Sequence, residues 1–215
     1  MFEPQLFDVL EQVVRSGCQK VAPLEDANLL PDSIYFSEQI PTGATPKETA
    51  ALRQKWLAHC RAQLTDCNLV FLDPDNGLEP KHFGLGNKKG CKSVSLKALP
   101  ALQAARSDAG GVSSSHSPHR ATPRRIAIRA PRLHQQGFER VDALRAKPFS
   151  PQTFFLLDAD DEIRNRAATL AKRWEGLISW YGDGVNPGGG EGSATSNFLP
   201  KSSDQNAMFA YTPES

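Results

Sequence analysis

The sequence contains no apolar run long enough to span a membrane, and its acidic, amphipathic N-terminus does not resemble a secretory signal. It contains no Cys-x-x-Cys pair either, which argues against a zinc ribbon. The formal net charge of only +1 excludes a strong overall attraction to nucleic acid or membranes. We therefore expect a cytoplasmic protein whose thiols are free and mostly buried. The cysteines are Cys18, Cys60, Cys67 and Cys91.

Apolar residues at helical spacing predict three long helices. The first spans residues 3–17, and its apolar face consists of Leu6, Val9, Leu10, Val13 and Val14. The second spans residues 45–64, where Thr45 and Glu48 have the spacing of a capping box. The third spans residues 158–176, and its stripe consists of Ile163, Ala167, Leu170 and Trp174.

Strands and helices alternate along the chain, which is typical of an α/β domain. The run "NLVFLD", residues 68–73, is apolar over four consecutive residues, as expected of a central strand buried on both faces. Later, residues 137–161 predict two strands joined by "KPFSP", which is too short for a crossover helix, so this pair should be antiparallel. We therefore predict one α/β domain over residues 1–181, with a mostly parallel sheet and a late antiparallel strand pair. Residues 182–215, rich in Gly, Ser, Asn and Pro, are expected to be a disordered tail.

Polar residues follow the apolar strand abruptly, in "DPDNG". In an open α/β sheet, ligands bind beyond the carboxyl ends of the strands, where Asp73 is expected. Pro74 fixes the turn, Asp75 and Asn76 favour turns through their short polar side chains, and Gly77 tolerates a positive φ. The segment is therefore either simply a good turn or a site. In a site, Asp73 and Asn76 would hold the amino group of a substrate, or a metal.

Of the metal ions considered for this turn, the sequence allows magnesium but not calcium. A calcium loop beginning at Asp73 fits poorly, because its twelfth residue is Gly84 and not a bidentate acid. Magnesium is an alternative, because it needs only one or two carboxylates, here Asp73 and Asp75. A site at His59 and Cys60 is not expected, because adjacent residues on a helix point in different directions.

Glycines and lysines gather just after the turn, in "FGLGNKKGCKS", residues 83–93. Lys88 and Lys89, with Gly77 beside them in the site, are candidates for binding a substrate phosphate. The spacing is not that of a P-loop, and the composition favours a solvated, flexible loop.

Residues 107–130, "SDAGGVSSSHSPHRATPRRIAIRA", lie where an α/β domain needs its next strand, yet show no usable apolar period. One interpretation is a basic loop that binds RNA or phosphate, since four arginines lie close together: Arg120, Arg124, Arg125 and Arg129. The other is a shifted reading frame, because allowed codons for residues 107–116, shifted by one base, encode Arg-Thr-Leu-Val-Val-Tyr-His-His-His, which has the character of a strand. The frame would be restored near Pro131.

The segments "LVFLDPDNGLEP", "KSVSL" and "RVDALRAKPFSPQTFFLLDAD" resemble an uncharacterised family of bacterial proteins with a Rossmann-like, methyltransferase-like look. The resemblance covers most of residues 1–181. Asp73-Pro74 after a strand is similar to the fourth motif of amino-methyltransferases, Asp/Asn-Pro-Pro-aromatic. There, the acid or amide holds the target amine during attack on the methyl sulfonium. The resemblance thus implies catalytic roles for Asp73, Asp75 and Asn76.

Two departures qualify what this resemblance implies. Asp75 and Asn76 stand where the second proline and the aromatic residue would be, which puts base stacking in doubt. Methyltransferases also bind S-adenosylmethionine at a glycine-rich turn after the first strand, and no such turn precedes Asp73. We therefore expect a chain truncated at its N-terminus, beginning on a helix.

Three functions follow as hypotheses. The first is a fragment of an S-adenosylmethionine-dependent amino-methyltransferase-like protein. The second is a magnesium-dependent nuclease or phosphoryl-transfer enzyme, with Asp73 and Asp75 on the metal and Lys88 or Lys89 on phosphate. The third is a non-catalytic protein whose basic segment binds nucleic acid.

Resequencing of the gene tests the shifted frame. We predict that the frame displaced by one base encodes an apolar strand across residues 107–115 and that the printed frame resumes near Pro131. Stop codons or polar sequence in the displaced frame would exclude the shift.

Overall fold

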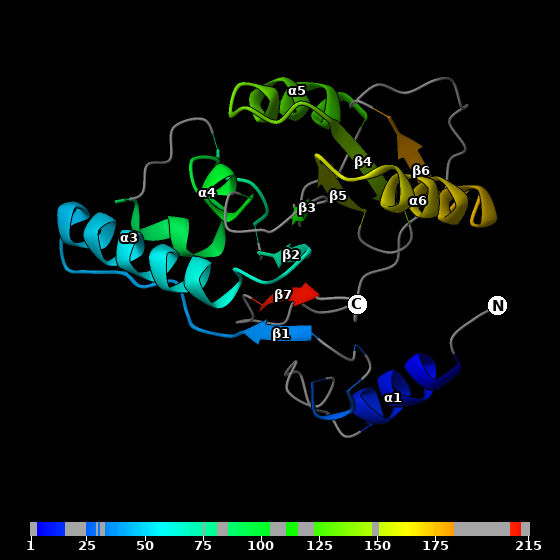
Figure 1. The fold of residues 1–215 in the computed structure, drawn as a ribbon, viewed down its shortest axis with the longest axis horizontal. Helices are drawn as coiled ribbons and strands as arrows, with labels where there is room; N and C mark the ends of the chain where they lie inside the picture. The colour runs from blue at the N-terminus through cyan, green and yellow to red at the C-terminus, as the bar shows by residue number, and fades with distance from the viewer. Residues whose placement is uncertain are drawn as a thin grey trace.

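The structure is a computed structural model, and it describes residues 4–15, 25–28, 30, 33–74, 76–80, 86–103, 111–115, 123–147, 151–182 and 207–211. The centre of the fold is a seven-stranded sheet with helices on both faces (Figure 1). The helices are α1 (Pro4–Arg15), α3 (Pro46–Gln63), the 3-10 helix η1 (Lys88–Lys92), α4 (Leu99–Gln103), α5 (Pro123–His134) and α6 (Asp161–Arg173). The strands are β1 (Ser33–Phe36), β2 (Leu69–Asp73), β3 (Gly111–Ser115), β4 (Val141–Ala146), β5 (Gln152–Leu157), β6 (Ile178–Tyr181) and β7 (Ala207–Tyr211).

The prediction of a mostly parallel, Rossmann-like sheet is wrong. The strand order is β1-β7-β2-β3-β5-β4-β6, and among the described neighbours only β2 and β3 pair in parallel. The register shows that β1, β2, β3 and β4 run in one direction, whereas β5, β6 and β7 run in the other. The alternation of helix and strand in the sequence indicates strand direction, but it does not indicate which later strand inserts between two earlier ones.

Part of the expected tail belongs to the sheet. Strand β7 lies between β1 and β2 and pairs with both in antiparallel register. The expectation of a disordered tail is therefore wrong for residues 207–211. Residues 183–206 and 212–215 lie outside the described part of the chain.

Residues 107–130 also contribute more than a basic loop. Residues 111–115 form β3, in the place where a strand was expected to be missing, and residues 123–134 form α5. Helix α5 buries Ile126, Ala130 and Leu133 at helical spacing, so the statement that the segment has no apolar period is wrong there. Residues 104–110 and 116–122 are outside the described ranges.

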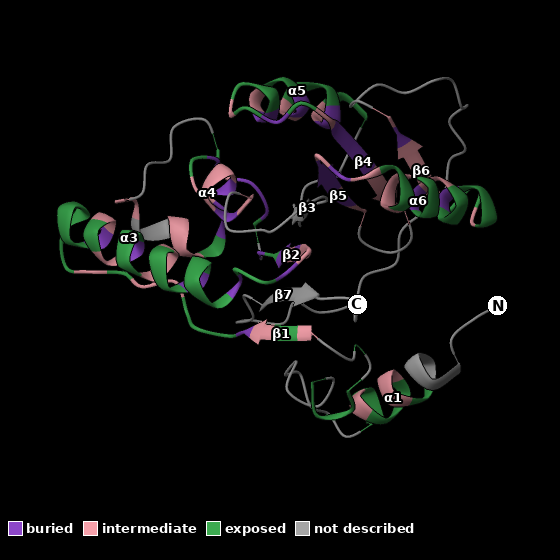
Figure 2. Cartoon of the chain, in the orientation of Figure 1, coloured by how far each residue is buried: buried purple, intermediate pink, exposed green. Residues whose placement is uncertain are grey.

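One face of the sheet carries the larger core. Register aligns Leu72, Phe155, Ala143 and Tyr181 in one row across the strands, and all four are buried (Figure 2). Buried side chains of α3, α4 and α5 pack against this face, among them Cys60, Leu102 and Leu133. Burial removes these apolar surfaces from water, which is the main favourable contribution to folding.

Both residues of the predicted capping box cap the start of helix α3, although Glu48 bonds the N–H of Ala44 and not that of the N-cap Thr45. Thr45 Oγ1 accepts a hydrogen bond from Glu48 N at 3.2 Å, and Glu48 Oε2 accepts one from Ala44 N at 2.8 Å. In α4, Pro100 lies in the first turn, where a missing N–H costs no intrahelical hydrogen bond. The predicted buried faces are less accurate, because Val14 of α1 is 76% exposed and Leu170 of α6 is 41% exposed. None of the described helices is both long and apolar enough to cross a membrane.

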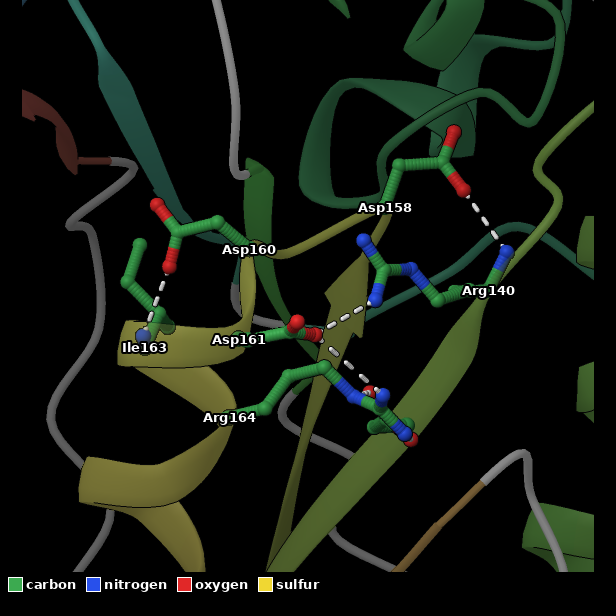
Figure 3. Close-up of polar contacts among 7 residues, drawn as sticks. Arg140, Asp158, Asp160, Asp161, Ile163 and Arg164 are labelled. Carbon is green, nitrogen blue, oxygen red and sulfur yellow. Dashed lines mark hydrogen bonds and ion pairs between the residues drawn. The ribbon is translucent and has the colours of Figure 1, made fainter.

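The other face of the sheet is covered by α6 through a small apolar cluster and one buried ion pair. Asp142 of β4 is fully buried, and Arg164 of α6 donates to it from Nε to Oδ2 at 2.6 Å and from Nη2 to Oδ1 at 3.1 Å (Figure 3). Two parallel hydrogen bonds of this kind fix the orientation of the guanidinium. The side chain of Asp160 caps the helix by accepting from Ile163 N at 2.7 Å.

Removal of one partner of the buried pair should be costly. We predict that Arg164→Met lowers the free energy of unfolding by about 3–5 kcal/mol, because it leaves the Asp142 carboxylate buried without its guanidinium. Urea unfolding followed by circular dichroism measures this.

The matched control is Arg166→Met on the same helix, because the Arg166 side chain is 77% exposed and pairs with Glu162 at the surface. It should cost no more than about 1 kcal/mol. The double variant Asp142→Leu with Arg164→Met should recover much of the loss. Equal losses in Arg164→Met and Arg166→Met would contradict the assignment.

Candidate functional site

The acidic turn begins at the edge of the sheet where several strands end together. Asp73 is the last residue of β2, is exposed, and lies in register with Ala207 of β7. Strands β1, β3 and β4 run in the same direction as β2, so their carboxyl ends lie at this same edge. Asp73 therefore lies at the edge of the sheet where four strands end and their connecting segments begin.

The bend of the turn is made by the main chain. Gly77 N donates to Pro74 O at 3.1 Å, and Gly77 has φ 69°, a conformation that favours glycine. Asn76 N donates to Lys92 O at 2.8 Å, which ties the turn to η1. Backbone groups thus hold the bend, and the side chains of Asp73 and Asn76 are exposed. Asp75 lies outside the described residues.

A short parallel pairing continues from the turn. Leu78 bridges to Val94, with Val94 N donating to Gly77 O and Glu79 N donating to Val94 O, both at 2.9 Å. This pairing joins the segment after the acidic turn to the segment before α4. The turn is thus fixed at both of its ends.

Glu79, which the sequence analysis did not single out, is a half-buried carboxylate at the end of this pairing. Its Oε1 accepts hydrogen bonds from Leu96 N at 3.0 Å and from Ser95 Oγ at 3.2 Å. Burial raises the pKa of Glu79, while these two hydrogen bonds and the charges of Arg132 and Lys97 act in the opposite direction. The sequence carries no local signal for the burial and hydrogen bonding of Glu79, because every partner of its carboxylate is distant along the chain.

The lysine-rich segment is anchored by a buried arginine. Arg53 of α3 is 5% exposed, and it donates from Nη1 to Asn87 O at 2.9 Å and from Nε to Pro41 O at 3.1 Å. A Cβ at Gly90 would lie 2.8 Å from Arg53 Nη1, so glycine allows the close approach. The main chain just before η1 is therefore hydrogen-bonded to α3, and Arg53 also packs closely against Gly90 of η1. The side chains of Lys88 and Lys89 are outside the described part of the structure.

Basic side chains of α5 lie next to Glu79. Arg132 Nη2 approaches Glu79 O at 3.4 Å, and Arg125 and Arg129 occupy the same side of the helix at spacings of four and three residues. Burial lowers the pKa of Arg129, and the neighbouring charges of Arg125 and Arg132 lower it further. The sequence analysis grouped Arg120, Arg124, Arg125 and Arg129 by closeness in the chain, and it missed Arg132 because it did not use the helical period.

A second group of acids lies at the opposite edge of the sheet and stabilises the fold. Asp158 follows β5, has φ 46°, and accepts from Arg140 N at 2.7 Å (Figure 3). It also accepts from Gln103 Nε2 at 2.6 Å. Asp161 pairs with Arg140 at 2.8 Å. Register places the end of β5 beside Gly111 at the start of β3, so this group cannot act together with Asp73.

The described residues do not form a metal site with three or more protein ligands, nor a cradle for S-adenosylmethionine. They contain no group of three or more His, Cys, Asp and Glu that could hold a metal. His59 contacts Glu38 at the surface whereas Cys60 is fully buried, as expected for adjacent helical residues. No described strand that ends at the edge of Asp73 leads into a glycine-rich turn: β1 leads into residues 37–45, where a Cβ at Gly43 would lie 2.7 Å from Glu48 Cγ. The residues in these ranges thus do not fit the methyl donor.

Comparison with protein-family models, with curated proteins and with solved structures finds no match to this chain. The resemblance to an uncharacterised bacterial family and to amino-methyltransferases therefore stays a prediction.

The raised pKa of Glu79 predicts a dependence of stability on pH. The folded chain keeps a proton on this carboxyl at pH values where the unfolded chain has lost it, so stability falls as pH rises above the ordinary value of 4.5. Glu79→Gln keeps an acceptor oxygen for Leu96 N and removes the charge. Urea unfolding of the variant and the parent at both pH values measures the difference in their stability. We expect this difference to favour the variant more at neutral pH than below pH 4.5. Glu139→Gln, an exposed control, should lack this difference, and an equal pH effect in both variants would contradict the prediction.

Proposed function

We propose that the acidic turn binds the amino group of a substrate, the role that the resemblance to amino-methyltransferases assigns to it. The observation that supports this is the exposure of Asp73 and Asn76 on a turn whose bend the main chain makes. Both side chains are therefore accessible to a ligand from solvent.

The chemistry of the two side chains suits an amine. The Asp73 carboxylate accepts hydrogen bonds only, and the Asn76 amide offers a carbonyl oxygen, so both accept from N–H groups. A charged acceptor forms the stronger of the two hydrogen bonds. Pro74 restricts the backbone between them, which reduces the entropy lost when a ligand binds.

A hydrated magnesium ion is a second candidate for the same turn. Magnesium keeps several waters and is often held by one or two carboxylates, so the exposed carboxylate of Asp73 at the end of β2 favours it. In that case the segment with Lys88 and Lys89 would meet the phosphate of a substrate, which is the phosphoryl-transfer hypothesis. The two candidate functions predict different ligands, an amine or magnesium, and calorimetry distinguishes them by which ligand releases or absorbs heat on binding.

Titration calorimetry with the full chain tests both. We expect adenosine, as a probe with an exocyclic amine, to bind the parent, and Asp73→Asn to weaken binding by about tenfold, because an uncharged acceptor forms a weaker hydrogen bond. S-adenosylmethionine and magnesium chloride are titrated in the same way.

Asp66→Asn is the matched control, since it removes one exposed carboxylate from the segment after α3. It should leave binding unchanged. Heat from magnesium alone, abolished by Asp73→Asn, would favour the phosphoryl-transfer candidate. If none of the three probes binds the parent, both candidates fail.

A further inference from the structure

The arginines of α5 form a stripe along one side of the helix. Arg125, Arg129 and Arg132 follow each other at four and three residues, and all three are half-buried. The stripe spans about 10 Å along the helix axis. Each of these arginines immediately precedes a buried residue of α5: Ile126, Ala130 and Leu133. The arginine side chains therefore start at the border of the core, on the same side of the helix, which keeps them close to one another.

This stripe concentrates positive charge in a segment of the sequence without acidic residues, although the charge of Arg132 also acts on the Glu79 carboxyl. The sequence contains no acidic residue between Asp108 and Glu139, although the net charge of the whole chain is only +1. Burial lowers the pKa of Arg129, and the like charges of Arg125 and Arg132 lower it further, as expected for three guanidinium groups at helical spacing on one side of α5. An anion placed against the stripe would be attracted by all three guanidinium groups, and the contact of Arg132 with Glu79 O fixes one end of the stripe.

Two kinds of phosphate-bearing partner carry such an anion, a nucleic acid and an anionic membrane. Membrane-surface helices insert a broad apolar face beside their basic residues. In α5 the apolar face is already buried against the sheet, and Ile128, 56% exposed, is the exposed large apolar residue of this helix. The planar guanidinium fork matches the geometry of a phosphate oxygen pair, and a linear stripe matches a backbone of repeated phosphates.

We propose that Arg125, Arg129 and Arg132 bind successive phosphates of a nucleic-acid backbone. This site is distinct from the amine-binding turn, and it stands or falls independently of the function proposed for Asp73. Contacts of this kind position a nucleic acid without reading its sequence, so binding should depend on salt more than on base composition.

Fluorescence anisotropy with a short labelled duplex DNA and the full chain tests the proposal. Three phosphate contacts predict that affinity falls roughly 40-fold between about 50 mM and about 200 mM salt. Arg125→Gln and Arg129→Gln should each weaken binding by roughly tenfold at low salt and reduce the salt slope by about one. These two residues are chosen because Arg132 also contacts the main chain of Glu79.

Arg61→Gln on α3 is the matched control, because it removes an exposed arginine of the same charge from another helix. It should change neither affinity nor slope. Thermal melting of Arg129→Gln shows whether the variant folds, and Arg129→Lys, which keeps the charge but not the fork, should retain the salt slope with weaker binding. Equal losses in Arg61→Gln, or an absence of binding by a folded parent, would overturn the proposal. Binding to phosphatidylserine vesicles with no binding to DNA would overturn it in favour of a membrane.

Discussion

The sheet depends on two strands that run against their neighbours and fill the gaps between strands of the other direction. Strand β5 separates β3 from β4, and β7 separates β1 from β2. A strand in the interior of a sheet must satisfy its backbone N–H and C=O groups on both sides. The insertion of β5 and β7 gives β2 and β3 partners on both sides, whereas β1 lies at the end of the strand order and β4 takes its second partner from β6. The larger core, α6 and the acidic turn all take their positions from this order.

Local signals in the sequence predicted local structure well. The capping box at Thr45 and Glu48 begins α3 as expected, and the short connection between residues 146 and 152 gives an antiparallel pair. Both depend on residues near each other in the chain, so periodicity and turn length suffice to find them. The pairing of β7 with β1 and β2 depends on segments far apart in sequence, and no local pattern contains it. A polar segment such as "GVSSS" also has low strand propensity, so its role as β3 comes from its neighbours.

The candidate site, like the fold, has features that local sequence patterns predict and features that depend on residues far apart in the chain. The position of Asp73 at the end of β2 could be read from an apolar run followed by turn residues. The contacts of Glu79 with Leu96 and Arg132, and of Arg53 with Asn87, join residues that are at least 17 positions apart, so sequence patterns could not reveal them. The arginine stripe could have been found, because its spacing of four and three residues is a helical period. Its apolar companion, Ile126, Ala130 and Leu133, keeps phase across Pro131, where a change of reading frame was predicted to end, and this continuity counts against a junction at that point.

The place of β7 has a consequence for how the chain folds during synthesis. Among the described strands, β1 joins the sheet only through β7, although 170 residues separate Phe36 from the start of β7 at residue 207. Proteins emerge from the ribosome N-terminus first, and strands that pair early are protected early. Of the described strands, β1 emerges first, and its partner β7 is the last of them to be released. The edge of β2 that β7 will cover stays open for the same interval, so the time between translation of the two strands is when this chain is most exposed to pairing with another copy.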